Sequence, residues 1–375
     1  MSRPLSQPGL DTVALAELEG SEQASLRVLV VRLSAMGDVI HGIPAIAALR
    51  AARPNWQIGW LIERRWMELL CAHPLERMEP RSEMKPLVDW LHLSDFKEWR
   101  KGLSSRETWS DMRGCMREVR AMKYDVAIDL QGAIRSAMAG RLSGAKTRIG
   151  LAQPREAPAR RFYTKAVDVQ APHVVEHGLS LASAAAGEDL MYEEPVFPQD
   201  EATEAWADRF CSSIGFAPLA IVNPGAGWGA KCWPAESYGA VASALADRGM
   251  AVMVNYGPNE EPLAQAVRQS SSEIARPVQC SVSQLIALTR RASLFVGGDT
   301  GPMHMAAAVG VPVVALFGPT RPDRNGPYAT RSVVLRSPAS IDNSSHVEDP
   351  DAGLQSISPE QVIAAADSLL KDQND

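Results

Sequence analysis

Short apolar runs alternate with helical patterns along most of this chain. In the first half the pattern predicts strands and helices in turn, with strands at 27–33, 57–62, 88–93 and 124–130 and helices at 44–52, 107–122 and 134–142. A second series starts at residue 219, with helices between strands at 219–223, 251–255, 294–296 and 312–317. Such alternation is typical of mostly parallel, doubly wound sheets. The sequence therefore predicts an α/β protein with two Rossmann-like units in tandem.

The same pattern divides the chain into five segments. They are a mobile tail at 1–25, a first domain at 26–187, a linker rich in acidic residues and prolines at 188–218, a second domain at 219–345, and a C-terminal segment at 346–375. The last segment is predicted to contain a helix that opens at Ser358, because Ser-Pro-Glu-Gln places Gln361 where a capping box needs it.

The composition is that of a globular protein, with 46% hydrophobic and 22% charged residues. No apolar run approaches the roughly 20 residues of a membrane-spanning helix, and the N-terminus lacks the pattern of a secretory signal. We therefore expect a cytoplasmic protein. The five cysteines show no spacing of a disulfide framework or zinc site, so we expect reduced packing residues and no metal.

Charge is distributed unevenly along the chain. Residues 24–187 contain 25 Lys/Arg against 17 Asp/Glu, a balance of +8, whereas residues 188–375 contain 12 against 23, a balance of −11. This asymmetry indicates that the first half meets an anionic partner, either nucleic acid or an anionic lipid headgroup. Six of the nine tryptophans lie between Trp56 and Trp109 among basic residues. A basic, tryptophan-rich surface suits a headgroup at a membrane interface, although core packing is expected to take half of these rings.

The segment 294–320 joins a short strand to a Gly-Asp-Thr-Gly turn and a helix. Unpaired backbone N–H groups at a helix start favour an anion, and glycines let a phosphate approach them. The turn also carries Asp299, Thr300 and His304, which are more polar than a strand-to-helix turn requires. The segment therefore indicates a phosphate site, with a plain capped turn of an α/β core as the alternative.

Two further segments carry candidate chemistry. Asp38 follows the first strand, where open α/β sheets bind ligands, so its carboxylate is either a general base for an attacking hydroxyl or a helix N-cap. In the second domain, the loop from Gly225 to Lys231 formally matches a dinucleotide fingerprint, but Pro234 follows too soon for a helix to start at the glycines. What remains is a glycine-rich loop whose Lys231 either meets a pyrophosphate or is solvated.

Four segments in register make the chain resemble glycosyltransferase family 9, the heptosyltransferases. They are SAMGDVIHGIPA, IDLQGAIRSA, NPGAGWGAKCWP and GGDTGPMHMAAA running on to FGPT. The resemblance covers about residues 26–329 and implies a GT-B fold, in which two Rossmann-like domains face a central cleft. The Ser-Ala-Met-Gly-Asp-Val start is similar to type I members rather than type II.

The resemblance also implies roles for individual residues. Asp38 aligns with the catalytic base and Lys231 with the lysine that meets the donor diphosphate. Donor binding is implied for Gly227, Asp299, Thr300, Gly301 and His304, and for Glu260 or Glu261 at the ribose; acceptor binding is implied for Met36, Gly37, His41, Arg64, Arg77 and Arg155. One departure is that members often place hydroxyl residues just before the lysine, where this chain has Gly227, Trp228 and Gly229.

The implied reaction is inverting transfer of heptose from ADP-heptose to a Kdo residue of a lipid A precursor, in lipopolysaccharide inner-core biosynthesis. We expect a monomer without cofactor, peripheral on the cytoplasmic face of the inner membrane, that binds no nucleic acid. One alternative is a GT-B transferase or epimerase for another nucleotide sugar. Another is a non-catalytic protein that binds anionic lipid or nucleic acid.

Overall fold

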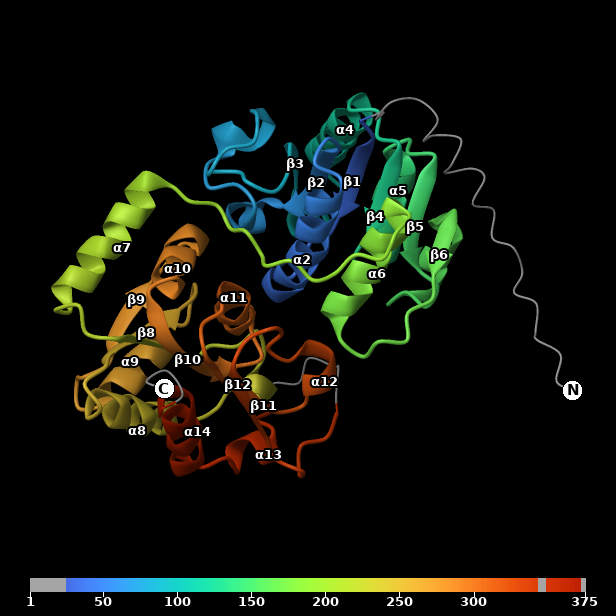
Figure 1. Cartoon of the computed structure of the whole chain (residues 1–375). Coiled ribbons are helices and arrows are strands. Elements are labelled where there is room, and N and C mark those ends of the chain that lie inside the picture. Colours follow the sequence, from blue (N-terminus) through green and yellow to red (C-terminus); the bar gives the residue numbers. More distant parts are fainter. Residues whose placement is uncertain (1–24, 343–348, 372–375) are drawn as a thin grey trace, which may run out of the picture.

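The computed structural model describes residues 25–342 and 349–371. They form two α/β domains, each built on a parallel six-stranded sheet with helices on both faces (Figure 1). This confirms the predicted fold class. The described residues contain no helix that combines the length and apolarity needed to cross a bilayer.

The first domain alternates strands with α-helices and short 3-10 helices. Its elements are β1 (Arg27–Val31), α2 (Met36–Ala52), β2 (Gln57–Glu63), η1 (Arg64–Leu69), η2 (Pro74–Met78), β3 (Trp90–Ser94), α3 (Phe96–Trp99), α4 (Arg106–Ala121), β4 (Val126–Asp129), α5 (Ile134–Leu142), β5 (Thr147–Leu151), η3 (Ala157–Phe162), β6 (Lys165–Val167) and α6 (Val174–Ala186).

The second domain repeats the alternation. Its elements are α7 (Glu201–Ser213), β7 (Leu219–Asn223), η4 (Gly229–Lys231), α8 (Ala235–Ala246), β8 (Ala251–Tyr256), α9 (Glu261–Ser270), β9 (Arg276–Gln279), α10 (Val282–Thr289), β10 (Ala292–Gly298), α11 (Gly301–Val309), β11 (Val313–Phe317), α12 (Pro322–Asn325), β12 (Ser332–Arg336), α13 (Ala352–Gln355) and α14 (Pro359–Lys371). The predicted capping box at its last helix is present, since the Ser358 backbone N–H donates to Gln361 at 2.8 Å.

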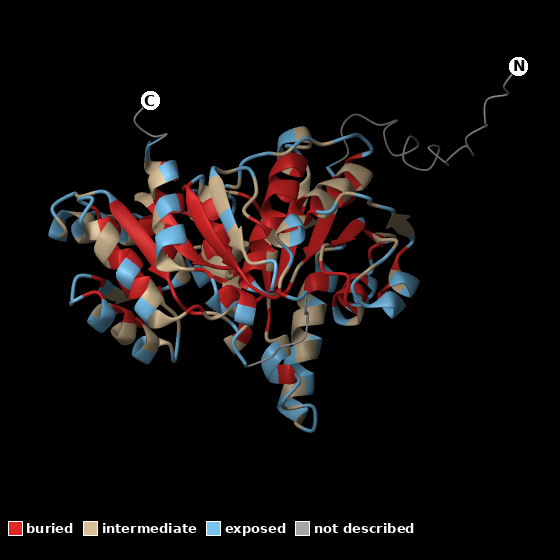
Figure 2. Ribbon diagram, turned by 90° about the horizontal axis from the view of Figure 1, so that it is seen from below, coloured by how far each residue is buried: buried red, intermediate tan, exposed pale blue. Residues whose placement is uncertain are grey.

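Both sheets have the same strand order. It is β3-β2-β1-β4-β5-β6 in the first sheet and, read from the β9 edge, β9-β8-β7-β10-β11-β12 in the second. The order reverses between β1 and β4 and between β10 and β7, and a ligand crevice is expected beyond the carboxyl ends of such neighbouring strands. The central strands are buried on both faces, which explains their continuous apolar runs (Figure 2).

Helices pack on each sheet through separate apolar clusters. In the first domain α2 and α6 cover one face and α4 and α5 the other. In the second domain α8, α9 and α14 cover one face, and α7, α10 and α11 the other. The C-terminal helix is therefore part of the second domain's core, and the short strands β5, β6, β9 and β12 extend the sheets beyond the strands named from the sequence.

The predicted linker contains a helix that is docked on the second domain. Glu204 of α7 forms ion pairs with Arg290 and Arg291 at 2.6 and 2.7 Å, both just after α10. The apolar core of the first domain also continues across the interface, because Leu285 and Met305 of the second domain belong to the same cluster as α2. The two domains are therefore joined by packed side chains as well as by the chain itself.

Candidate active site between the two domains

A cavity of about 660 Å³ lies beyond the carboxyl ends of β1 and β4 and reaches the second domain at α12. Its lining is mostly polar and includes Asp38, His41, Gln131, Arg155, His177 and Arg324. The cavity thus occupies the place where the strand order reverses, and it brings together three of the candidate residues: Asp38, His41 and Arg155.

Asp38 is the third residue of α2, so the N-cap position belongs to Ala35 and not to Asp38, and the role of general base stays a prediction. Its Oδ2 accepts the Ala35 backbone N–H at 3.1 Å, so it caps the helix start. Its Oδ1 lies 2.7 Å from a guanidinium nitrogen of Arg32, and its side chain stays 37% exposed toward the cavity. The carboxylate is therefore fixed in position and still accessible to a substrate hydroxyl.

Arg32 is a site residue that the sequence reasoning missed. It follows β1 directly, and only 12% of its side chain is exposed. Besides the ion pair, it donates to the Asp38 carbonyl at 3.1 Å and to the Leu130 carbonyl after β4. The one signal in the sequence was its place, since it is the first charged side chain after a buried strand that leads to Asp38.

In the second domain, Lys231 and Asp299 meet because β7 and β10 are neighbouring parallel strands, and both loops leave from the same edge. Lys231 Nζ lies 2.6 Å from Asp299 Oδ2 and 3.1 Å from the Asp299 carbonyl oxygen. An ammonium has three N–H donors, and Asp299 receives two of them among the contacts of the described residues. Asp299 leaves the third N–H unused, and the ammonium also lies 5.4 Å from the centroid of the Trp228 ring.

Burial raises the pKa of Asp299, but the hydrogen bond with His304 and the charge of Lys231 outweigh it and hold that pKa well below its usual value. The carboxylate is thus ionised. The adjacent start of α11 has no side-chain cap, because the Thr300 hydroxyl donates to the Gly298 carbonyl at 3.3 Å. Pro302 has no N–H, and the Met303 N–H donates to the Thr300 carbonyl at 3.1 Å, so the expected phosphate site at this turn stays a prediction.

Met36, Gly37 and Gly301 lie where α2 of the first domain contacts α11 of the second. A Cβ added to Gly37 would lie 2.4 Å from His304 Cδ2, and one added to Gly301 would lie 2.6 Å from Met36 Sδ. Both glycines are therefore needed for this close approach of two helices. The structure gives all three residues a place in the domain interface, whereas the resemblance implied direct contact with substrate.

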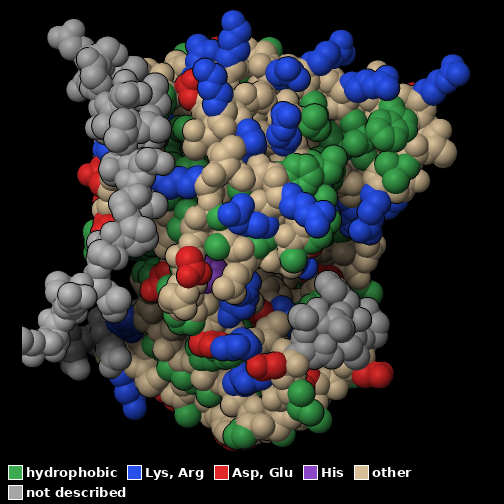
Figure 3. All heavy atoms as spheres, turned by 90° about the vertical axis from the view of Figure 1, so that its right-hand side faces the viewer, with side chains coloured by type: hydrophobic (Ala, Val, Ile, Leu, Met, Phe, Trp, Pro, Cys, Tyr) green, Lys and Arg blue, Asp and Glu red, His purple; other side chains and the backbone are tan. Residues whose placement is uncertain are grey.

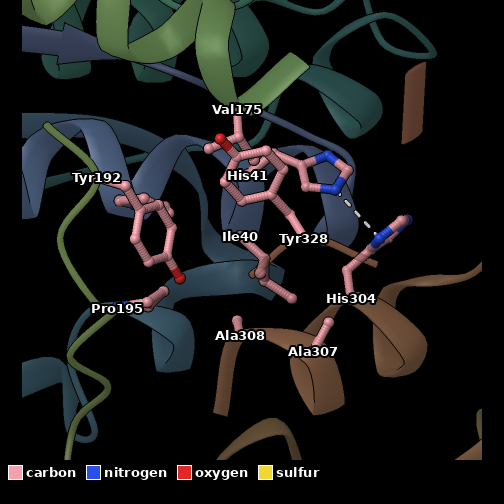
Figure 4. Close-up of a pocket in the computed structure, with 10 residues that line it drawn as sticks. Ile40, His41, Val175, Tyr192, Pro195, His304, Ala307, Ala308 and Tyr328 are labelled. Atoms are coloured by element: carbon pink, nitrogen blue, oxygen red, sulfur yellow. Dashed lines mark hydrogen bonds between the residues drawn. The ribbon is translucent and has the colours of Figure 1, made fainter. Parts of the chain in front are cut away.

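His41 and His304 point toward each other across this interface, with 3.1 Å between His41 Nε2 and His304 Nδ1 (Figure 4). The other nitrogen of His304, Nε2, lies 3.1 Å from Asp299 Oδ1. Tyr192 and Tyr328 line the same small pocket, with Tyr328 beside His41 and Tyr192 on the side away from His304. The two halves of the site are therefore hydrogen-bonded to each other through this pair of histidines.

The structure distinguishes the two glutamates considered for ribose binding. Glu260 accepts the Gly257 backbone N–H at 2.7 Å, and a Cβ on Gly225 would lie 2.3 Å from its carboxylate. Glu260 thus lies against the glycine-rich loop, where Gly227 is exposed, while Glu261 is exposed at the start of α9. Glu260 is the better-placed candidate. The first helix after the loop starts only at Ala235, which agrees with the rejection of a dinucleotide fingerprint.

Arg77 and Arg64 are not brought to the cavity. Arg77 forms a two-pronged ion pair with Glu118 of α4, at 2.8 and 3.0 Å. The hydrogen bond from buried His92, followed by that from Arg77, lowers the pKa of Glu118 to about 2. Arg64 is 60% exposed and pairs with Asp95 at 3.1 Å. The structure therefore assigns Arg77 to a structural ion pair, which corrects its expected contact with acceptor.

The expected tryptophan-rich surface is also wrong. Trp60 and Trp99 are buried, and Trp56, Trp66 and Trp90 are partly buried in apolar clusters or on arginine side chains. Only Trp109 of the six is exposed, at 45%. Trp60 of β2 and Trp90 of β3 pack in the apolar clusters between the sheet and its helices.

Comparison with known proteins agrees with this architecture. The model of glycosyltransferase family 9 (heptosyltransferase) matches residues 112–352. Lipopolysaccharide heptosyltransferase 1 of Pseudomonas aeruginosa is 30% identical over 83% of this chain and 84% of that protein. A glycosyl transferase family 9 structure from Veillonella parvula has a TM-score of 0.78 and 26% identity, covering 94% of this chain and 100% of that one.

A further solved relative is the E. coli heptosyltransferase WaaC. Its structure with ADP has a TM-score of 0.70 and 25% identity over 93% of this chain and 100% of that one, and it was also solved with ADP-2-deoxy-2-fluoro heptose. The fold is thus GT-B, and the protein is a glycosyltransferase. The chain belongs to glycosyltransferase family 9, the heptosyltransferases.

Proposed function

We propose that the protein transfers heptose from ADP-L-glycero-D-manno-heptose to a Kdo residue of Kdo-lipid A, with inversion at the transferred carbon. The observation that carries this proposal is the opposition of Asp38 and the Lys231–Asp299 pair on the two sides of one domain interface. In a direct displacement, the acceptor oxygen attacks C1 of the sugar from the face opposite the leaving ADP. A base and a diphosphate site on opposite sides fit that geometry.

Each half of the site supplies one part of the reaction. Asp38 takes the proton of the attacking hydroxyl as the new C1–O bond forms, and the bond from C1 to the diphosphate oxygen breaks. The departing ADP gains negative charge on that oxygen. The Lys231 ammonium and the N–H groups at the start of α11 are fixed donors that stabilise this charge. A positive residue at Arg155 on the acceptor side suits a phosphorylated acceptor.

Support for an ADP-linked donor comes from the E. coli relative that was solved with ADP and with a fluorinated ADP-heptose. Support for a Kdo acceptor comes from the type I form of the SAMGDV segment and from the relatives named heptosyltransferase 1. The described residues contain no group of three or more His, Cys, Asp and Glu that would hold a metal ion.

The test is release of ADP or UDP from a panel of nucleotide sugars, with and without Kdo-lipid A, in the presence of EDTA. We expect ADP release that requires both ADP-heptose and a Kdo-bearing acceptor and that survives EDTA. Activity on a heptosylated core but not on Kdo-lipid A contradicts the type I assignment. Conversion of a nucleotide sugar without any acceptor contradicts transfer and identifies the epimerase alternative.

We further propose that the first domain docks on the anionic cytoplasmic face of the inner membrane through α5 and η3. Residues 131–167 contain eight Lys/Arg and one acid. This stretch exposes the apolar Met138 and Leu142 of α5 together with five basic side chains, which are Arg135, Arg141, Lys146, Arg160 and Arg161. Figure 3 shows Lys and Arg gathered around hydrophobic side chains on the first-domain half of this face. Charge complementarity therefore supports an anionic bilayer as partner.

Vesicle flotation tests this docking surface. Each basic residue near an anionic membrane contributes about 1 kcal/mol, so R141E/R160E/R161E is expected to lose binding to phosphatidylglycerol vesicles. The control is R268E/R276E/R331E, three substitutions on the second domain, which should bind as the wild type does. Equal loss in both triple variants, or binding of wild type to duplex DNA as tight as to vesicles, contradicts the assignment.

A further inference from the structure

A line of buried polar side chains runs from the first domain to the candidate donor site. His41 contacts His304 at 3.1 Å, His304 contacts Asp299 at 3.1 Å, and Asp299 contacts Lys231 at 2.6 Å. His41, Asp299 and His304 are only 8%, 6% and 6% exposed. The first residue of the line sits on α2, three positions after Asp38, and the last is the lysine expected at the diphosphate.

For a neutral His304, hydrogen-bond chemistry gives this line a direction. The ionised Asp299 carboxylate can only accept, so His304 Nε2 donates to it. In a neutral His304 the other nitrogen, Nδ1, is then an acceptor, and His41 Nε2 must donate to it. His41 Nδ1 is left as a lone pair, and it has no partner among the described residues. A second proton, on Nδ1, would make His41 a buried cation. The unpaired lone pair on Nδ1 costs less than that charge would.

The surroundings of His41 keep it neutral. Burial is the main cause that lowers the pKa of His41 well below 6.5, and the positive charge of Arg32 lowers it further, while Asp299 acts in the opposite direction. A neutral His41 with its proton on Nε2 is therefore the form that matches the donor direction of the line.

We propose that His41 is a positioning residue that acts through His304 and Asp299 on Lys231. Its Nε2–H holds His304 in the Nε2–H tautomer, His304 holds the Asp299 carboxylate in place, and Asp299 fixes the ammonium at the donor diphosphate. This inference rests on the proposed role of Lys231 as a diphosphate ligand. It differs from the acceptor-contact role that the resemblance implied for His41, since His41 Nδ1 is fully covered in this arrangement.

The interface geometry supports a positioning role. The absence of a side chain at Gly37 leaves the space that His304 occupies, with its Cδ2 atom 2.4 Å from where a Cβ would be. His304 is thus held by a helix of one domain while it is anchored in the other. The consequence is that Lys231 is fully supported only when α2 and α11 are in contact, which links domain closure to the donor site.

His173 provides a matched control at the same interface. It is a buried histidine at the N-cap of α6 whose Nε2 donates to the Gly326 carbonyl of the second domain at 3.1 Å, while its Nδ1 accepts the Val175 backbone N–H at 3.2 Å. It packs edge-on against His41 at 5.6 Å but is not part of the line to Lys231. Its removal costs a cross-domain hydrogen bond without touching Asp299.

The experiment compares H41L, H41Q and H173L by calorimetric ADP binding and by steady-state kinetics, with thermal unfolding to follow the fold. One neutral hydrogen bond corresponds to roughly 2- to 12-fold in affinity. We expect H41L to raise the ADP Kd and the donor KM by about that factor, with kcat changed less. H41Q keeps an N–H donor and is expected to restore both to within about 2-fold. H173L should lower thermal stability and leave the ADP Kd unchanged.

Nitrogen-15 shifts of the imidazole rings give a readout that needs neither donor nor turnover. We expect the Nε2–H tautomer at both His41 and His304 in the wild type. The proposal is overturned if either ring carries its proton on Nδ1, if H41L leaves the ADP Kd unchanged, or if H173L raises it as much as H41L does. If wild type fails to turn over ADP-heptose while the tautomers are as expected, the proposed function fails and the line of hydrogen bonds stands.

Discussion

Replacing Asp38 with Asn tests the assignment of the base most directly. The amide has the shape of the carboxylate, and its oxygen can still accept the Ala35 N–H now held at 3.1 Å. Arg32 loses its ion-pair partner but keeps its bonds to the carbonyl oxygens of Asp38 and Leu130. Asp38 is 37% exposed, so the loss of this pair is expected to cost no more than about 1 kcal/mol of stability.

The chemical effect should be much larger than the structural one. A positioned general base contributes about 10²- to 10⁴-fold in rate, which is roughly 3 to 5 kcal/mol of barrier. We therefore expect D38N to lower kcat by that factor in an ADP-release assay with ADP-heptose and Kdo-lipid A. The donor KM should change by less than about 3-fold, because the proposed diphosphate contacts lie in the other domain.

The control is Asp95→Asn, which removes a carboxylate of similar exposure from an ion pair with Arg64 outside the cavity. D95N is expected to keep kcat within about 2-fold. If D38N turns over at the wild-type rate while D95N does too, Asp38 is a helix cap and not the base. If both variants lose activity together, the effect lies in folding, and thermal unfolding will show it.

Three further predictions follow from particular contacts. Lys231→Met removes a charge-assisted hydrogen bond worth about 1.5 to 3 kcal/mol, so calorimetry should show ADP bound roughly 10- to 150-fold more weakly, and unchanged ADP affinity would remove Lys231 from the donor site. The pKa of Glu118 is lowered to about 2 from 4.5, so its ionised form stabilises the fold fully above pH 4.5, and this contribution is lost as the pH falls toward 2. In urea unfolding, the stability of Glu118→Gln should therefore fall less steeply with acid than that of the wild type, with kcat/KM within about 2-fold at neutral pH. An equally steep fall in both proteins would refute the shift. Gly37→Ala places a methyl 2.4 Å from His304, so we expect lower stability, by about 1 to 3 kcal/mol, together with weaker ADP binding. In the control, Gly59→Ala, the methyl meets Tyr124 instead, and only stability should fall.

The strand pattern was enough to predict the fold because both sheets are buried on two faces. Runs such as VLVV in β1 and VVALF in β11 have the apolar continuity that only a covered parallel strand needs. The short edge strands β6 and β9 were not predicted, since KAV and RPVQ are only partly buried and carry no such continuity. Helix α7 was missed for a related reason, because its acidic first turn resembles the linker that precedes it.

Candidate residues were predictable where the chemistry is local, and not where it depends on a partner far away in the chain. Asp38 and Asp299 follow buried strands, and strand order alone places such residues at the crevice. For Arg77, the resemblance implied a contact with the acceptor. Its partner is Glu118, 41 residues later, and no local pattern shows which acid an arginine will meet.

The contact of His41 with His304 spans 263 residues and explains why two separate nucleotide-fold domains act as one site. A base on one domain and a diphosphate ligand on the other are useful only in a fixed relative position, because a misplacement of about 1 Å can cost a hundredfold in rate. Apolar packing of Leu285 and Met305 on the first domain holds the domains together without fixing a register. The relative position of the domains is fixed by directional hydrogen bonds through the buried histidines. The glycines add to this because they allow only one close approach of α2 to α11. We therefore expect variants that weaken this contact to speed ADP release as well as to weaken donor binding.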